Sequence, residues 1–180
     1  CFYHDASAVL LIGEKIFAAA QEERFTRKKF DNSFPVNSIK YCLKAAKIEP
    51  QDLDILAFYE DPYLKLDRLI ESQTFFAPLE FIRNYKRIKL WLGNKFNIEK
   101  YVKKTLPAFK GQLCFYHHHL SHAASAFYPS PFNRASILTV DGIGEWACSS
   151  ISIGEGNKLD LKYEQRFPHS VGLLYSAFTQ

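Results

Sequence analysis

Two strand-like runs near the start of the chain constrain its fold more than any other feature. They cover Ser7–Ile12 and Lys15–Gln21, and Gly13-Glu14 between them suits the tight turn of a β-hairpin. Further strand-like runs follow at 55–59, 112–116, 135–141, 148–153 and 158–165. Because helical patterns separate several of these runs, the sequence predicts an α/β fold whose strands run in mixed directions.

The helical patterns fall in three parts of the chain. Pro35 introduces apolar residues at helical spacing, and Pro50 is expected to end that helix. Another helix is predicted from about His118 to Phe127, where a Tyr-Pro-Ser-Pro run ends it. Residues from about 61 to 107 differ in character, and Phe81–Leu92 has apolar residues every three or four positions. We interpret 61–107 as a helical insertion that covers one edge of the sheet.

Composition places the chain among globular proteins rather than disordered or membrane-spanning ones. With 180 residues, 47% hydrophobic and 23% charged, it can bury one ordinary core. No run approaches the roughly 20 apolar residues of a membrane span, and the first residues do not resemble a signal peptide. Four separated cysteines without a CxxC pair suit reduced thiols in the cytoplasm. The missing methionine and the strand-like start indicate a piece of a longer protein, truncated at both ends.

A run of histidines carries the clearest chemical signal. His118 and His122 are four residues apart and would share one helix face, and His119 with His122 is the competing pair. Asp141 ends an apolar strand, at the sheet edge where α/β proteins bind ligands. Two imidazoles and one carboxylate suit Fe(II), Mn(II) or Zn(II). The competing interpretations are surface histidines at a helix start and an aspartate that only forms a turn.

Other candidate residues are weaker when taken one at a time. Gly142 and Gly144 follow the strand of Asp141, and their backbone N–H groups suit contact with a phosphate. His4 lies in a turn between two predicted strands and carries an imidazole, a side chain that can act as a general base. Lys28 and Lys29 end a charged loop, which is equally consistent with a solvated surface. None of these would define a function without the histidines.

Several segments together resemble the N-terminal region of the carbamoyltransferases, the family of nodulation and antibiotic O-carbamoyltransferases. The resemblance covers essentially the whole chain in order, and five matched segments make it specific. They are Tyr3–Ala8, Glu22–Lys29, His118–Phe127, Val140–Ala147 and Phe167–Ser176. Two positions depart from the family pattern: Phe30 stands where a histidine is common, and Cys148 where a hydroxyl residue is usual.

The resemblance implies an actin–sugar kinase–Hsp70-like (ribonuclease H-like) domain with flanking helices, similar to the universal tRNA-threonylcarbamoyl enzyme. Residues 1–180 would form part of this metal- and nucleotide-binding domain, and an adenylate-forming domain would follow beyond Gln180. By resemblance, His118, His122 and Asp141 fall on metal-ligand positions, with a further aspartate ligand beyond the chain. His4 falls on the position of the proposed base.

The leading hypothesis is therefore an O-carbamoyltransferase with Fe(II), and with Mn or Zn as alternative metals. Carbamoyl phosphate and ATP, with Mg, would give carbamoyl-adenylate, whose phosphate would lie near Lys28 or Lys29, Gly142 and Gly144. The acceptor would be a small hydroxyl compound such as a nodulation factor, an antibiotic or a sugar-like molecule.

Three other hypotheses remain open at the level of sequence. A tRNA-modifying enzyme of the threonylcarbamoyl type would favour a strongly basic surface, whereas the net charge here is only +4. A non-haem iron oxygenase would need a β-barrel pattern of strands, whereas these histidines lie on a predicted helix. A non-catalytic metal or nucleotide module is the third.

Overall fold

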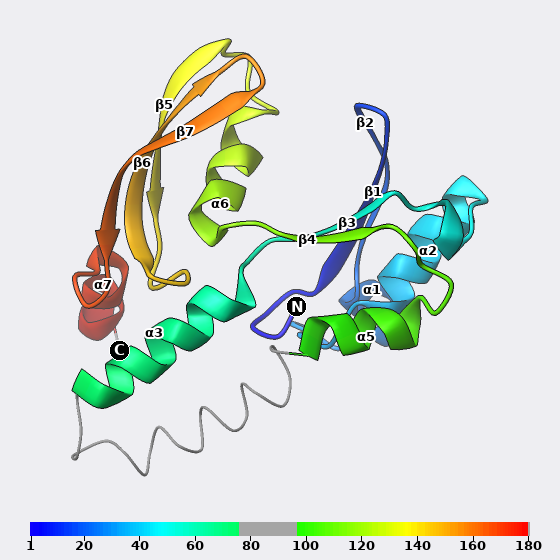
Figure 1. Ribbon diagram of the computed structural model, residues 1–180, viewed down its shortest axis with the longest axis horizontal. Coiled ribbons are helices and arrows are strands. Elements are labelled where there is room, and N and C mark those ends of the chain that lie inside the picture. The colour runs from blue at the N-terminus through cyan, green and yellow to red at the C-terminus, as the bar shows by residue number, and fades with distance from the viewer. Residues whose placement is uncertain (76–96, 180) are drawn as a thin grey trace. The chain divides into compact units, whose positions relative to one another are not determined.

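The computed structural model describes residues 1–75 and 97–179, which divide into two compact units (Figure 1). Residues 1–56 and 97–113 belong to unit 1, and residues 57–75 and 114–179 belong to unit 2. Strands in the described part form three small sheets, of two, two and three strands. The mixed α/β class predicted from the sequence is confirmed. No helix in these ranges is long and apolar enough to cross a membrane.

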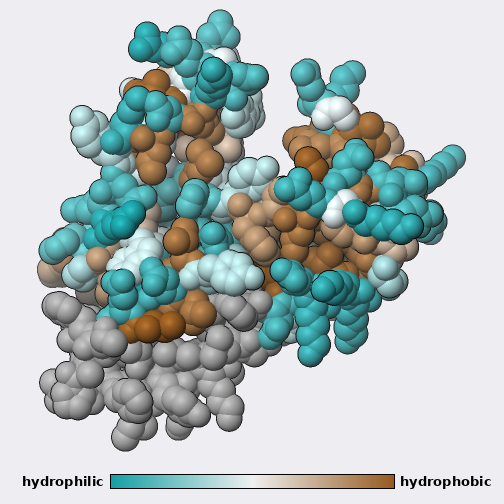
Figure 2. Space-filling view, in the orientation of Figure 1, coloured by the Kyte–Doolittle hydropathy of each residue, from teal (hydrophilic) through white to brown (hydrophobic). Residues whose placement is uncertain are grey.

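Unit 1 begins with the predicted hairpin, at the predicted bounds. β1 (Ser7–Ile12) and β2 (Lys15–Gln21) pair antiparallel, and Gly13 turns the chain with a φ of 60°. α2 (Val36–Ala46) packs on one face of the hairpin, where Leu10, Ala18 and Cys42 form a buried cluster. Alternation along the strands leaves residues such as Val9 and Phe17 exposed, and Figure 2 shows apolar side chains below the hydrophilic tip.

Three local details of unit 1 differ from the sequence interpretation. The charged stretch expected to be a loop contains a short helix, α1 (Glu23–Thr26). α2 ends at Ala46 rather than at Pro50, because Lys47 takes the left-handed conformation, and Pro50 instead begins the short 3-10 helix η1 (Pro50–Asp52). No strand precedes β1 in the described residues, so the segment before it is a bend rather than a turn between two strands.

Glu22 is a buried carboxylate that ties β2 to the start of α2. Its side chain accepts hydrogen bonds from the backbone N–H groups of Asn37 and Ser38, at 3.1 and 2.9 Å, and from both side chains. These N–H groups lie in the first turn of the helix, where no backbone acceptor reaches them. Glu22 therefore has a structural role that its place in a charged stretch did not indicate.

Two further strands and two helices lie around the predicted insertion. β3 (Ile55–Phe58) and β4 (Gln112–Phe115) pair in parallel, since Gln112 N–H bonds to Asp54 and Tyr116 N–H to Phe58. α3 (Pro62–Phe75) and α5 (Ile98–Thr105) lie at the two ends of the predicted insertion 61–107, so both of its ends are helical. The amphipathic helix predicted around Phe81–Leu92 lies outside the described residues.

Unit 2 contains the three-stranded sheet, in the order β5-β6-β7 with both pairs antiparallel. The strands are β5 (Arg134–Val140), β6 (Ala147–Glu155) and β7 (Lys158–Arg166). α6 (His118–Phe127) lies beside this sheet and buries Ala123 and Phe127 against Ile137 (Figure 1). α7 (Val171–Thr179), which the sequence patterns did not predict, follows β7.

Candidate metal centre

α6 brings two of the predicted metal ligands together, and the end of β5 supplies the third. The Nε2 atoms of His118 and His122 are 3.0 Å apart, as the spacing of one helical turn allows. His118 Nε2 is also 3.0 Å from the Oδ2 atom of Asp141. The ligand atoms of all three side chains lie within 4.8 Å of one another. The trio predicted from the sequence is therefore assembled in one place.

The turn after β5 holds the carboxylate of Asp141. Its Oδ1 atom accepts the N–H of Gly142 at 2.6 Å, which leaves Oδ2 toward His118. The backbone N–H of Asp141 bonds to the carbonyl of Cys148 at 2.9 Å, so β6 fixes the main chain. The hydrogen bond with His118, helped by that from Gly142, lowers the Asp141 pKa to about 2. Asp141 is therefore a carboxylate at any physiological pH.

The second histidine is held in its neutral form. Partial burial lowers the pKa of His122 below its ordinary value, and the neighbouring His118 lowers it further. A neutral imidazole has a lone pair to offer, whereas a protonated imidazole has none. His122 is therefore prepared to act as a ligand near neutral pH.

His119, the alternative partner of His122, belongs to the interior instead. Its side chain is buried, and its Nδ1 atom lies 2.9 Å from the hydroxyl of Ser150 on β6. Burial is also the largest cause of the lowered His119 pKa. His118 and His122, which are four residues apart, face Asp141. His119, three residues before His122, faces Ser150 instead.

The geometry of these atoms fits a divalent transition ion. His118 Nε2 has two close neighbours, His122 Nε2 and Asp141 Oδ2, yet a neutral ring carries at most one hydrogen there. A cation placed among the three atoms would satisfy all of them at once. Two imidazoles and a carboxylate are the donor set found with Fe(II), Mn(II) and Zn(II).

Glu145 supports the start of α6 and was not predicted from the sequence. It is buried, and its Oε1 atom accepts the backbone N–H of His118 at 3.1 Å and that of Asp61 at 2.5 Å. Burial raises the pKa of Glu145, and these hydrogen bonds oppose the rise. A carboxylate at a helix start is also favoured by the helix dipole. Glu145 thus fixes the residue that carries the first ligand.

The two glycines of the turn have different surroundings from those expected. The N–H of Gly142 bonds to Asp141, and that of Gly144 bonds to the carbonyl of Ala147 at 2.8 Å. A Cβ atom at Gly144 would collide with the imidazole of His118, whereas one at Gly142 would only touch Leu173 at 3.7 Å. The missing side chain of Gly144 therefore makes room for His118.

The remaining predicted residues belong to unit 1. His4 is exposed, and its Nδ1 atom lies 2.8 Å from the Oδ2 atom of Asp5. Lys28 and Lys29 are exposed as well. His4 and the lysines therefore keep their proposed roles only as predictions.

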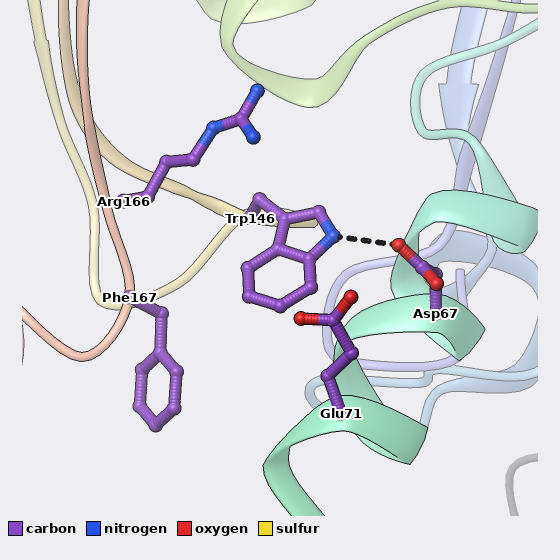
Figure 3. Close-up of a pocket in the computed structure, with 5 residues that line it drawn as sticks. All are labelled: Asp67, Glu71, Trp146, Arg166 and Phe167. Carbon is purple, nitrogen blue, oxygen red and sulfur yellow. Dashed lines mark hydrogen bonds between the residues drawn. The ribbon is translucent and has the colours of Figure 1, made fainter. Parts of the chain in front are cut away.

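A small pocket opens in unit 2. It has a volume of about 190 Å³ and is lined by Asp67, Glu71, Trp146, Arg166 and Phe167 (Figure 3). The indole N–H of Trp146 donates to Asp67 at 3.2 Å, and the carboxylate of Glu71 lies near the same ring. None of the five residues was singled out in the sequence, because they come from α3 and from the β6–β7 region, far apart along the chain.

Comparison with known proteins decides the family. The family model described as Carbamoyltransferase N-terminus matches the chain over residues 1–180. The chain belongs to the carbamoyltransferase family. The resemblance read from the five sequence segments is thereby confirmed, and the candidate metal centre lies within the matched region.

Three curated relatives of the chain are considerably longer than the chain itself. It is 46% identical over 99% of its length to the uncharacterized protein sll1178 of Synechocystis, of which it spans 30%. It is 36% identical over 97% of its length to the nodulation protein NolNO of Sinorhizobium fredii, and spans 25% of that protein. An archaeal relative, the uncharacterized protein MJ1051 of Methanocaldococcus jannaschii, is 27% identical and 28% covered.

Replacing Gly144 by alanine should damage the centre, and Gly142→Ala provides a matched control in the same turn. The added methyl group at Gly144 would push the His118 ring aside, an overpacking that typically costs about 1–3 kcal/mol of the free energy of unfolding. Gly142→Ala should change stability by less than about 1 kcal/mol. Urea unfolding of both variants measures the change in the free energy of unfolding, and metal titration measures the change in metal affinity. Equal metal affinity in the two variants would contradict the steric role of Gly144.

Proposed function

We propose that the protein containing this chain transfers a carbamoyl group to the hydroxyl of a small acceptor molecule. The observation that carries the proposal is the convergence of His118, His122 and Asp141 in a chain of the carbamoyltransferase family. A relative is named as a nodulation protein, which favours a nodulation factor or a similar sugar-like acceptor. Because the name of this relative refers to nodulation, we regard a tRNA acceptor as the weaker alternative.

The trio would hold a divalent ion, which we propose to be Fe(II), through the two Nε2 atoms and one carboxylate oxygen. When bound, such an ion acts as a Lewis acid that polarises an acyl oxygen. Asp141 would contribute a carboxylate oxygen, and His118 and His122 would contribute one imidazole nitrogen each.

His4 is proposed to accept the proton of the acceptor hydroxyl. Asp5 lies at its Nδ1 atom, 2.8 Å away, and favours the tautomer in which Nδ1 carries the hydrogen. The Nε2 atom then has a free lone pair, as a general base requires. Exposure of the ring leaves it accessible to an incoming acceptor.

The carbamoyl donor is proposed to be carbamoyl-adenylate, made from carbamoyl phosphate, ATP and water in the presence of Mg, with phosphate and pyrophosphate released. The chain spans less than a third of each of the three longer relatives named above, so we assign adenylate formation to another part of the protein. Lys29 is proposed to contact the adenylate phosphate. Gly142 and Gly144 already donate their N–H groups within the turn, so phosphate contact there would require these bonds to break. For the complete domain we propose the actin–sugar kinase–Hsp70-like fold, supported by an antiparallel hairpin followed by a parallel pair.

Isotope exchange in the intact protein tests this function. Labelled pyrophosphate should exchange into ATP only when carbamoyl phosphate is present, because the exchange reports reversible formation of the adenylate. A chelator that removes the transition ion, with Mg kept in excess, should stop transfer of labelled carbamoyl groups to acceptors and leave the exchange unchanged. Exchange that is independent of carbamoyl phosphate would count against carbamoyl-adenylate. Transfer that persists in the metal-free protein would count against the role of the centre.

A further inference from the structure

The second ring nitrogen of His118 lies in an unusual environment. Nδ1 is buried and makes no hydrogen bond in the described residues. A buried polar atom without a partner is costly, so its surroundings need an explanation. The acidic group that faces it is the carboxylate of Glu60, whose Oε2 atom is 3.9 Å from Nδ1. This side of the ring is opposite the side that faces Asp141.

Glu60 lies two residues beyond β3 and is almost completely buried. Its side chain is 3% exposed, and the Nζ atom of Lys65 lies 2.7 Å from the same Oε2 atom. Lys65 comes from the first turns of α3 and supplies the opposite charge that a buried carboxylate needs. A carboxylate oxygen has two lone pairs, so Oε2 is able to accept a hydrogen bond from Lys65 and another from Nδ1.

The surroundings of His118 hold its ring in this orientation. Gly144 lies directly against the imidazole, and the ring of Tyr59 is 5.7 Å away between centroids. Glu145 holds the backbone N–H of His118 at 3.1 Å. With the ring held from several sides, Nε2 keeps facing the trio and Nδ1 keeps facing Glu60.

We propose that Glu60 is a positioning residue that selects the metal-binding tautomer of His118. A hydrogen on Nδ1, attracted by the Glu60 carboxylate, leaves the lone pair of Nε2 for the ion. Metal-binding histidines commonly donate their other N–H to a carboxylate in this way. The proposal rests on the proposed metal centre and adds to it a residue that touches neither the ion nor the substrate.

The 3.9 Å separation is longer than a hydrogen bond and is expected to shorten when the centre is loaded. A cation at Nε2 withdraws electron density from the imidazole and makes its Nδ1–H a stronger donor. Hydrogen bonds around functional sites are often long in the free protein and tighten when the ligand binds. A shift of about 1 Å of the Glu60 carboxylate toward Nδ1 would reach hydrogen-bond length.

Cobalt titration of the intact protein tests the role of Glu60. Co²⁺ is added to the metal-free protein in competition with a chromophoric chelator, which gives the affinity, and the visible bands of bound Co²⁺ report the ligand field. Glu60→Gln removes the charge at nearly constant volume. It should weaken Co²⁺ binding by about 10- to 100-fold, the usual cost of losing such a partner, and shift the visible bands.

Glu22→Gln is the matched control, because Glu22 is equally buried but bonds to backbone and side-chain donors of α2 rather than to a histidine. It should leave Co²⁺ affinity and bands unchanged. If Glu60→Gln fails to fold, Glu60→Asp replaces it: the charge opposite Lys65 stays, but the carboxylate is withdrawn from Nδ1, so affinity should still fall. Wild-type affinity and bands in the folded Glu60 variant would overturn the proposal. Failure of the wild-type protein to bind Co²⁺ would instead overturn the metal centre.

Discussion

Replacing His118 and His122 together by alanine should remove the bound metal from the intact protein. The two side chains supply two of the three ligand atoms that converge within 4.8 Å. Losing an indirect partner of a metal ligand already costs about 10- to 100-fold in affinity, so losing two direct ligands should cost more. Only carboxylate ligands would then remain, Asp141 and the aspartate expected beyond residue 180, and carboxylates alone suit a transition ion less well than imidazoles do. Elemental analysis after anaerobic purification should show about one ion per wild-type chain and almost none in the double variant.

His119→Gln is the control for this experiment, since it changes a histidine of the same helix that faces Ser150 rather than Asp141. A glutamine keeps a polar group near Ser150, so α6 should stay folded and metal content should stay near that of the wild type. The two variants together separate loss of ligands from damage to the helix. Unchanged metal content in the double variant would refute the assignment of the centre, and metal loss in His119→Gln alone would favour the other histidine pair.

The parts of the fold that the sequence predicted well are those set by local patterns. The bounds of β1, β2 and α6 agree with the prediction at both ends. Alternating apolar residues around Gly13, and helical spacing closed by a Pro-rich run, are signals contained within a few residues. The pairing of His118 with His122 follows from the same helical geometry.

The supporting residues of the centre could not be predicted, because their partners are distant along the chain. Glu60 faces His118 from a position 58 residues earlier in the chain. Glu145, which accepts the backbone N–H of His118, lies 27 residues after it. Each reads as an ordinary acidic residue in its own segment. The choice between His119 and His118 likewise depended on Ser150, which is brought to α6 only by the folding of β6. Helical spacing alone allowed both pairs.

The separation into three small sheets was also beyond local patterns. Strand runs indicate which residues are extended but not which strands pair, so one mixed sheet and several small ones look alike. The sequence patterns also missed α7, because no polar face marks a helical period in its sequence. Its apolar residues are largely exposed in this chain.

Replacing His4 by asparagine should lower carbamoyl transfer by about 10²- to 10⁴-fold, the usual contribution of a positioned general base. An alcohol loses its proton far above neutral pH, so it attacks a carbonyl poorly unless a base accepts that proton as the bond forms. Asparagine keeps a polar side chain but has no basic nitrogen. Asp5→Asn should lower transfer less, because it removes only the carboxylate 2.8 Å from Nδ1 and leaves the imidazole in place.

The His4→Asn variant separates this role from the other steps, because neither metal binding nor adenylate formation requires the His4 side chain in the proposed scheme. Its metal content and its carbamoyl-phosphate-dependent pyrophosphate exchange should therefore equal those of the wild type. Transfer of labelled carbamoyl groups to the acceptor should be the step that fails. His4 is exposed, so its replacement should not disturb folding, and circular dichroism of the variant checks this directly. Transfer at the wild-type rate would show that another residue accepts the proton. Loss of the exchange as well would show that His4 acts before the transfer step.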